Sequence, residues 1–130
     1  MGRRAVERDL IGQRRHQALQ ELSHSLRDLE VGLSIFFLGL FKKVVFADYL
    51  AVNLIDRVFD DPSAYSSAEV MVGLYAYTLQ IFCDFSGYTD VARGSGMLFG
   101  LQLPENFDRP YMAKSPAEFW RRWHMTLSTW

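Results

Sequence analysis

The seven residues from Glu118 to His124 carry the most chemistry for their length. They contain three aromatic rings, two guanidinium groups and one imidazole, at Phe119, Trp120, Arg121, Arg122, Trp123 and His124. An imidazole acts as base, acid or hydrogen-bond donor near neutral pH, so His124 is the candidate catalytic residue. The same composition also suits an interfacial helix that anchors in lipid headgroups through Trp and Arg, with His124 as a bystander. The residue types alone leave both interpretations open.

A helix must position these groups, and its start is readable in the sequence. Ser115 is a suitable N-cap, Pro116 suits the first helical position, and Glu118 completes a capping box. We therefore predict one helix over residues 116–130, in which Glu118 pairs with one of the two arginines a turn later. On that helix a spacing of four places three side chains in one row: Trp120, His124 and Ser128.

The composition fits one small domain with enough apolar material for a core. The 130 residues are 49% hydrophobic, 15% aromatic and 22% charged, with a formal net charge of −1, so we expect no nucleic-acid partner. Residues 1–15 hold five arginines and form a charged, frayed lead-in to a domain at residues 16–130. Cys83 is the only cysteine, so neither an internal disulfide nor a cysteine-based zinc site can form.

The apolar runs are short for a membrane protein. The longest charge-free runs cover 14 residues at 70–83 and 11 residues at 31–41, below the ~18 of an unambiguous spanning helix. However, residues 31–41 are apolar all round and include Gly and Ser among large side chains, as membrane helices do. We expect residues 31–57 and 67–83 to embed in a membrane.

Helical patterns account for most of the chain. A stripe of leucines spaced by three and four residues predicts a first helix, at Leu19, Leu22, Leu26, Leu29 and Leu33. A second helical stretch covers residues 31–58, and a capping box at Ser66 and Glu69 starts a third that runs to Cys83. Residues 103–110 read as a loop between prolines. No segment alternates as a strand does, so we predict an all-α fold.

Polar side chains interrupt the apolar sequence directly after Cys83. Five of the next seven residues carry hydrogen-bonding side chains: Asp84, Ser86, Tyr88, Thr89 and Asp90. In an apolar setting they require a polar cavity or a packed network, whereas in water they form an exposed loop, and both interpretations stay open. We expect no metal site, because the two aspartates have no third ligand nearby in sequence. Gly96 and Gly100 have the small-xxx-small spacing that lets helices approach closely.

Four motifs, taken together, resemble the membrane-bound O-acyltransferase family. Their order and spacing make the resemblance specific, and it covers roughly residues 29–130: Leu40–Asp48, Gln80–Asp90, Leu103–Phe107 and Glu118–Trp130. The branch that the chain resembles most is the bacterial alginate O-acetyltransferase type, with the D-alanine transferases of teichoic acid as cousins. The resemblance favours the polar-cavity interpretation of residues 84–90 and a site role for His124.

The resemblance implies a multi-pass helical protein of the bacterial inner membrane. Such proteins transfer an acyl group, here acetyl, to hydroxyls of an exported or cell-surface polysaccharide. They use two histidines, of which His124 corresponds to one, and the other lies in a later helix beyond Trp130. The chain is therefore expected to be an internal fragment of an acyltransferase, truncated at both ends and inactive by itself.

The resemblance also implies partners and site residues. The acyl donor, a thioester or an acyl carrier, is a co-substrate, and no tightly bound cofactor is expected. Membrane lipid and proteins of the polysaccharide export or acetylation machinery are the expected partners. Besides His124, the expected donor-binding or site-lining residues are Trp120, Arg121, Arg122, Trp123, Asp84, Ser86, Tyr88, Asp90 and Asn106. The competing hypothesis is a non-enzymatic helical protein held at a membrane interface by its Trp/Arg segment.

Overall fold

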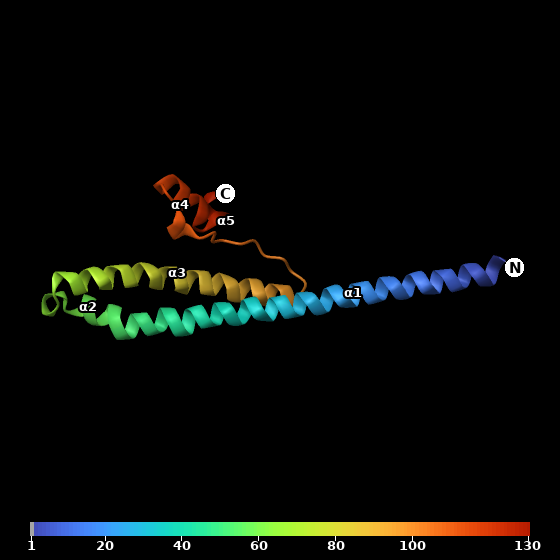
Figure 1. The fold of residues 1–130 in the computed structure, drawn as a ribbon, viewed down its shortest axis with the longest axis horizontal. Helices are drawn as coiled ribbons and strands as arrows, with labels where there is room; N and C mark the ends of the chain where they lie inside the picture. Colours follow the sequence, from blue (N-terminus) through green and yellow to red (C-terminus); the bar gives the residue numbers. More distant parts are fainter. Residues whose placement is uncertain (1) are drawn as a thin grey trace.

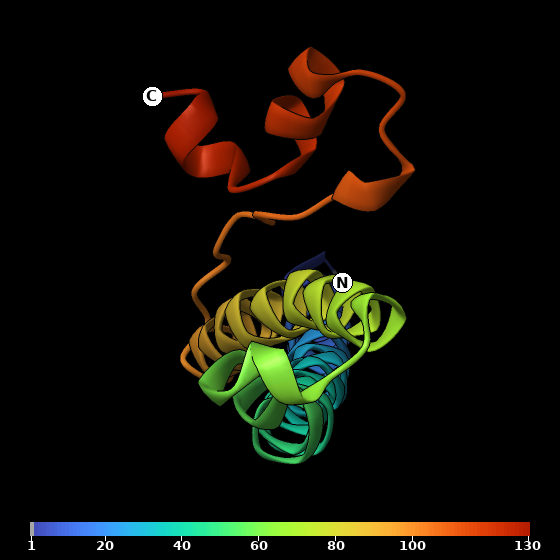
Figure 2. The ribbon, with the colours of Figure 1, turned by 90° about the vertical axis from the view of Figure 1, so that its left-hand side faces the viewer.

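The computed structural model describes the backbone of residues 2–130 and the side chains of residues 7–130. Two long antiparallel helices dominate it, α1 (Gly2–Phe41) and α3 (Ser67–Leu98), and the first part of α1 projects beyond the end of α3 (Figure 1). The segment after α3 lies against the α3 side of this hairpin (Figure 2). Within the described residues there is no strand, so the all-α prediction is confirmed.

The first two predicted helices are one helical rod. After α1 the chain continues as the π-helix η1 (Lys42–Asp48), the two α-helical residues Tyr49 and Leu50, the π-helix η2 (Ala51–Ile55) and the short α2 (Asp56–Asp60). The rod ends at Asp60, two residues after the predicted end at residue 58, and the capping box that starts α3 is confirmed. The prediction that residues 1–15 are a frayed lead-in was wrong for the residues that the structure describes, because α1 begins at Gly2.

Glycines let α1 and α3 pack with their backbones in contact. A Cβ atom on Gly39 would lie 2.6 Å from the carbonyl oxygen of Gly87, and one on Gly94 would lie 2.5 Å from that of Gly32. Neither distance is compatible with a side chain, so these four positions set the separation of the two helices. The pairs repeat at an interval of seven residues on both helices, which keeps them on one face of each.

The glycine pair that the sequence singled out has a different role. A Cβ atom on Gly96 would approach Leu101 and Leu103 of the following loop, and Gly100 has a φ of +75° just after α3. Gly100 therefore takes the left-handed conformation that ends many helices, where a residue with a side chain is strained. The small-xxx-small reading of Gly96 and Gly100 as a helix–helix contact was wrong.

The third helix does not end at Cys83. It continues through residues 84–90 to Leu98, so the interpretation of this stretch as an exposed loop was wrong. Two charged side chains of the stretch face cations of η1, because Asp84 pairs with Lys43 at 2.5 Å and Asp90 with Lys42 at 2.6 Å. These pairs satisfy the carboxylates without any break in the helical hydrogen bonds.

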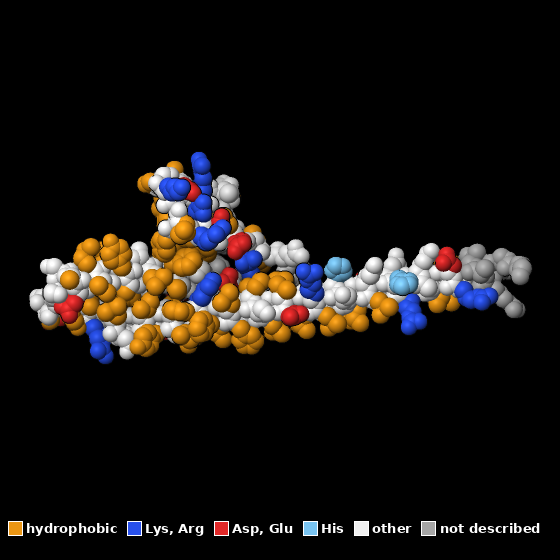
Figure 3. Space-filling model, viewed as in Figure 1, with side chains coloured by type: hydrophobic (Ala, Val, Ile, Leu, Met, Phe, Trp, Pro, Cys, Tyr) orange, Lys and Arg blue, Asp and Glu red, His pale blue; other side chains and the backbone are white. Residues whose placement is uncertain are grey.

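The core is small, and much apolar surface is exposed. The buried apolar side chains among the described residues are Ala47, Ile55, Val58, Cys83, Phe107 and Pro110. Large apolar side chains are exposed along the outer face of α1 and over α3 (Figure 3). Within the part of the chain that the structure describes, no helix combines the length and the apolarity needed to cross a bilayer.

Candidate functional site

His124 lies at a sharp turn between two short helices. α4 (Pro116–Arg122) ends at Trp123, which is extended, and His124 has φ 45° and ψ 57°, before α5 (Met125–Ser128). A continuous helix over residues 116–130 was therefore wrong, and Trp120, His124 and Ser128 do not form a row. A non-glycine residue in the left-handed region is uncommon, and such residues gather at functional sites.

Contacts with the preceding loop break the helix at this point. Phe107 and Trp123 form an antiparallel bridge, in which the amide of Asp108 donates to the carbonyl of Arg122 at 3.0 Å. The amide of Met125 donates to the carbonyl of Asn106 at 2.9 Å. The Arg122 carbonyl and the Met125 amide are thus bonded to the loop, while the Trp123 amide still bonds Phe119 of α4, and these bonds together fix the turn at His124.

Asn106 holds the turn through its side chain as well. Its Oδ1 accepts hydrogen bonds from the amide of Thr126 at 3.1 Å and from the Thr126 hydroxyl at 2.6 Å. This is the geometry of a capping residue, supplied by a residue 20 positions away instead of by the residue before α5. Asn106 was among the predicted site residues, and the structure gives it a positioning role beside His124. Thr126 was missed, because nothing in its own spacing indicates a distant partner.

A cluster of rings attaches this segment to α3. The ring centroids of Phe107 and Trp123 are 5.0 Å apart, those of Phe85 and Phe107 are 5.0 Å apart, and Phe85 meets the His124 imidazole edge-on at 4.9 Å. The Tyr111 hydroxyl adds a bond to the α3 backbone at 2.6 Å, and burial raises the pKa of that phenol. The imidazole is half-buried, and its nitrogens have no hydrogen-bond partner among the described residues.

The start of α4 orients the two arginines. Ser115 Oγ accepts from the amide of Glu118 at 3.2 Å, while the Glu118 carboxylate accepts from the amide of Lys114 at 2.8 Å. The capping box is thus only half formed, with Lys114 in place of Ser115. Arg122 donates to Glu118 at 2.7 Å, as predicted for one of the arginines, and the Lys114 amide and then Arg122 lower the pKa of Glu118. Arg121 is exposed.

The polar residues of α3 divide between a cavity and the surface. Ser86, Asp90 and Asn106 line a cavity of about 290 Å³, together with charged residues that were not among the predicted site residues: Lys42, Arg93, Glu105 and Arg109. His124 does not line this cavity. Asp84 lies outside it and faces η1, and Tyr88 is 64% exposed. Trp120 is also exposed, so the structure gathers the predicted residues into two neighbouring groups rather than one.

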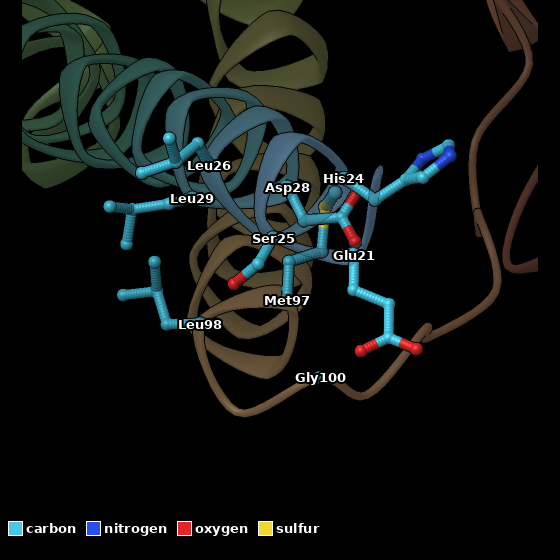
Figure 4. Close-up of a pocket in the computed structure, with 9 residues that line it drawn as sticks. All are labelled: Glu21, His24, Ser25, Leu26, Asp28, Leu29, Met97, Leu98 and Gly100. Atoms are coloured by element: carbon cyan, nitrogen blue, oxygen red, sulfur yellow. The ribbon is translucent and has the colours of Figure 1, made fainter. Parts of the chain in front are cut away.

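Another cavity, of about 430 Å³, lies where the end of α3 meets α1. Glu21, His24 and Asp28 of α1 and Met97 of α3 are among its lining residues (Figure 4). Its lining residues are distant in sequence from His124, and none of them belongs to the turn at His124. Among the described residues, no group of three or more His, Cys, Asp or Glu side chains is placed to hold a metal ion anywhere.

Comparison with known proteins gives a consistent result. Residues 8–130 match the family described as MBOAT, membrane-bound O-acyltransferase family. The chain is 42% identical over 125 residues to a probable alginate O-acetylase of Azotobacter vinelandii, covering 95% of this chain and 23% of the relative. It is 46% identical over 102 residues to a peptidoglycan O-acetyltransferase of Helicobacter pylori, covering 78% and 19%. A teichoic acid D-alanyltransferase of Bacillus subtilis is 46% identical over 57 residues, covering 44% and 14%. The chain spans less than a quarter of each relative's length.

Proposed function

The chain belongs to the membrane-bound O-acyltransferase family, and from that premise we propose that it is part of an enzyme that acylates polysaccharide hydroxyls. The acyl group is acetyl, and the acceptor is an exported or cell-surface polysaccharide. Support for this acceptor class comes from relatives named for alginate, peptidoglycan and teichoic acid, three polymers that carry hydroxyl groups. The activity belongs to the whole protein, of which this chain spans a part, and we expect the isolated segment to be inactive.

The observation that carries the proposal is the state of His124. Its backbone is fixed in a left-handed turn by Asn106 and Trp123, its ring is backed by Phe85, and its nitrogens have no partner among the described residues. A satisfied structural histidine would instead bond a carbonyl or carboxylate through one of its nitrogens. The arrangement supports a role in which the imidazole meets a group from outside this chain.

The proposed reaction moves one acyl group and one proton. One of the two family histidines accepts the proton of the acceptor hydroxyl, and the hydroxyl oxygen attacks the carbonyl carbon of the acyl donor, while His124 orients the donor or shares in the proton transfer. With a thioester donor, the carbon–sulfur bond then breaks, and the departing thiolate takes the proton from the imidazolium. His124 shares this work with the second family histidine, and the donor is a co-substrate rather than a tightly bound cofactor.

The basic and aromatic side chains around His124 suit the donor or the lipid surface. Arg121 is exposed, whereas Arg122 is held by Glu118. Arg121 is therefore the guanidinium available to donor phosphates or lipid headgroups. Trp123 packs within the ring cluster and supports His124, while Trp120 is 61% exposed and faces the surroundings of the site.

We place the whole protein in the bacterial inner membrane as a multi-pass protein, with residues 31–57 and 67–83 embedded. The exposed apolar side chains of α1, η1 and α3 support this proposal, since water is a poor solvent for such a surface. Membrane lipid, the acyl donor and proteins of the polysaccharide export or acetylation machinery are the partners that follow. No feature of the chain suggests a nucleic-acid partner, and its net charge is −1.

Substitution of His124 in the whole enzyme tests the function. We expect His124→Ala to reduce acyl transfer by ~10²-fold or more, the scale of a lost acid–base group, at an unchanged protein level in the membrane. His124→Gln keeps hydrogen bonding but carries no proton at neutral pH, so retained activity there would mean that His124 only positions a group. His24→Ala, on the exposed part of α1, is the matched control. Normal acetylation by His124→Ala would refute the catalytic role.

A non-enzymatic membrane anchor is the second candidate, and one observation favours it. Trp120 is 61% exposed and Trp130 fully exposed, as expected of rings that insert at a lipid interface. If anchoring is the whole function, replacing both tryptophans with alanine releases the protein from membranes and His124→Ala has no phenotype. The acyltransferase proposal expects the opposite result: His124→Ala reduces acetylation more than replacement of the two tryptophans does.

A further inference from the structure

One buried hydroxyl group in the cavity beside α3 has no partner. Ser86 is 3% exposed, and its Oγ makes no hydrogen bond with the residues that the structure describes. The neighbouring Thr89 hydroxyl is already used, because it donates to the Ser86 carbonyl at 2.9 Å. Leaving a buried hydroxyl unbonded costs free energy, so the Ser86 hydroxyl at this cavity indicates a bound group that completes its hydrogen bonding.

The cavity has spare hydrogen-bond donors on several walls. Lys42 has three donors and uses one on Asp90 at 2.6 Å. The guanidinium of Arg93 makes two long contacts of 3.5 Å, to Asp90 and to Glu105, and leaves most of its N–H groups unused. The amide nitrogen of Asn106 has no partner among the described residues, since only its oxygen bonds Thr126. A ligand here therefore meets donors from three sides.

Acceptors on the walls are fewer and already engaged. Both oxygens of Asp90 contact cations, one Lys42 and the other Arg93. Glu105 contacts Arg93 through one oxygen, and its side chain is 60% exposed to solvent. The lining residues carry three positive groups against two carboxylates, but the third, Arg109, is 82% exposed and pairs with Asp108 at 3.6 Å, so the walls carry no clear excess of charge. The walls therefore offer more free donors than free acceptors, and an acceptor-rich ligand fits this surplus of donors.

We propose that this cavity binds an oxyanion, a carboxylate or a phosphate group. Its volume of about 290 Å³ holds such a group with a short attached chain, and Ile35, Leu38 and Phe82 provide apolar walls for the attached part. His124 does not line this cavity, but Asn106 and Phe107, which hold the turn at His124, do, so the site is next to the place proposed for acyl transfer. Ser86, Lys42 and Arg93 supply the hydrogen bonds, which are strongest when both partners are charged.

Titration of the whole protein that contains this chain, in a non-ionic, phosphate-free detergent, tests the proposal. Inorganic phosphate and glycerol phosphate are followed by ³¹P line broadening and acetate by ¹³C line broadening, each against chloride at matched ionic strength, because salt screens exposed charges. We expect saturable binding by at least one anion. Ser86→Ala, which keeps every ion pair, weakens it about fivefold, the loss of one hydrogen bond. Arg93→Gln weakens it about tenfold or more.

Two further variants separate the site from general charge effects. Arg57→Gln removes an exposed guanidinium on α2 without touching the cavity, and binding is unchanged. Asp90→Asn frees Lys42 and Arg93 from their carboxylate, so it tightens binding, provided that circular dichroism shows the same helix content. This opposite sign is not expected of a residue that only maintains the fold.

Each outcome decides the proposal. Tighter binding of glycerol phosphate than of phosphate supports the site with a lipid headgroup as the source of the oxyanion, and equal or weaker binding supports it with a free phosphate. Preference for acetate supports the site with a carboxylate. If no anion binds saturably, the cavity holds water only and the proposal is overturned. It is also overturned if Ser86→Ala binds as the wild type does, or if Arg57→Gln loses as much as Arg93→Gln.

Discussion

Among single residues, His124 shows how a side chain is kept available for chemistry. Its left-handed backbone costs about 1–2 kcal/mol in a residue other than glycine. Asn106, Trp123 and Phe107 offset that cost through hydrogen bonds and ring contacts on both sides of the turn. The result is an imidazole that is fixed in place by its neighbours while its own nitrogens remain unbonded to the described residues.

Asn106 provides a test of this arrangement that does not touch the imidazole. Asn106→Ala removes the acceptor of two Thr126 hydrogen bonds, so we expect a loss of about 1–2 kcal/mol in unfolding free energy, as for other capping residues. Urea unfolding followed by tryptophan fluorescence measures it. Asn53→Ala, which removes an exposed bond from Asn53 to the Tyr49 carbonyl, is the control with little expected effect. Equal losses in the two variants would show that Asn106 does not hold the turn.

Among the elements, the sequence predicted where helices start better than where they end. Ser66 and Ser115 lie at helix starts, because a cap acts within one turn and its signal is local. The ends at Leu98 and Arg122 depend on distant partners. Lys42 and Lys43 neutralise the aspartates that suggested a loop after Cys83, and the loop at Phe107 captures the backbone beside Trp123. Such pairings are not visible in the spacing of either segment alone.

The packing of α1 on α3 gives a prediction for glycine substitutions. Gly87→Ala places a Cβ atom 2.7 Å from the carbonyl oxygen of Gly39, so the helices must separate, and we expect a loss of about 1–3 kcal/mol or more. Gly12→Ala is the control, because nothing lies within 4 Å of its Cβ position, and it should stabilise α1 by up to about 1 kcal/mol. Thermal unfolding by circular dichroism compares the two. A neutral Gly87→Ala variant would contradict the close contact between these helices.

The start of α4 gives a prediction for pH. The Lys114 amide and then Arg122 lower the pKa of Glu118 in the folded chain, so the ionised carboxylate stabilises the fold. That contribution is complete above the ordinary glutamate pKa of about 4.3 and is lost as the pH falls through the lower folded value. Glu118→Gln should therefore be less stable than wild type at pH 7, and the difference should shrink in acid. Unfolding midpoints between pH 7 and pH 3 measure this, and a constant difference would argue against it.

For the whole molecule, the large exposed apolar surface and the small buried core indicate what surrounds the protein. A hairpin of two long helices with a small buried core leaves large apolar side chains on its outer faces, and this extent of exposure is unusual for a chain that is surrounded by water (Figure 3). The sequence predicted the helices and their apolar content. It did not predict which faces remain open, because that depends on the register of the glycine contacts between α1 and α3.

Labelling along α1 tests whether the exposed apolar face lies in lipid. In a Cys83→Ala background, single cysteines replace Phe37, which is 61% exposed on the apolar part of α1, and Gln20, which is exposed among polar residues. In membrane vesicles a water-soluble maleimide should modify position 37 much more slowly than position 20, because lipid excludes the reagent from the first site. In denaturant both positions should react at the same rate, which controls for intrinsic reactivity. Equal, rapid labelling in vesicles would show that position 37 is in contact with water and would remove the support for an embedded α1.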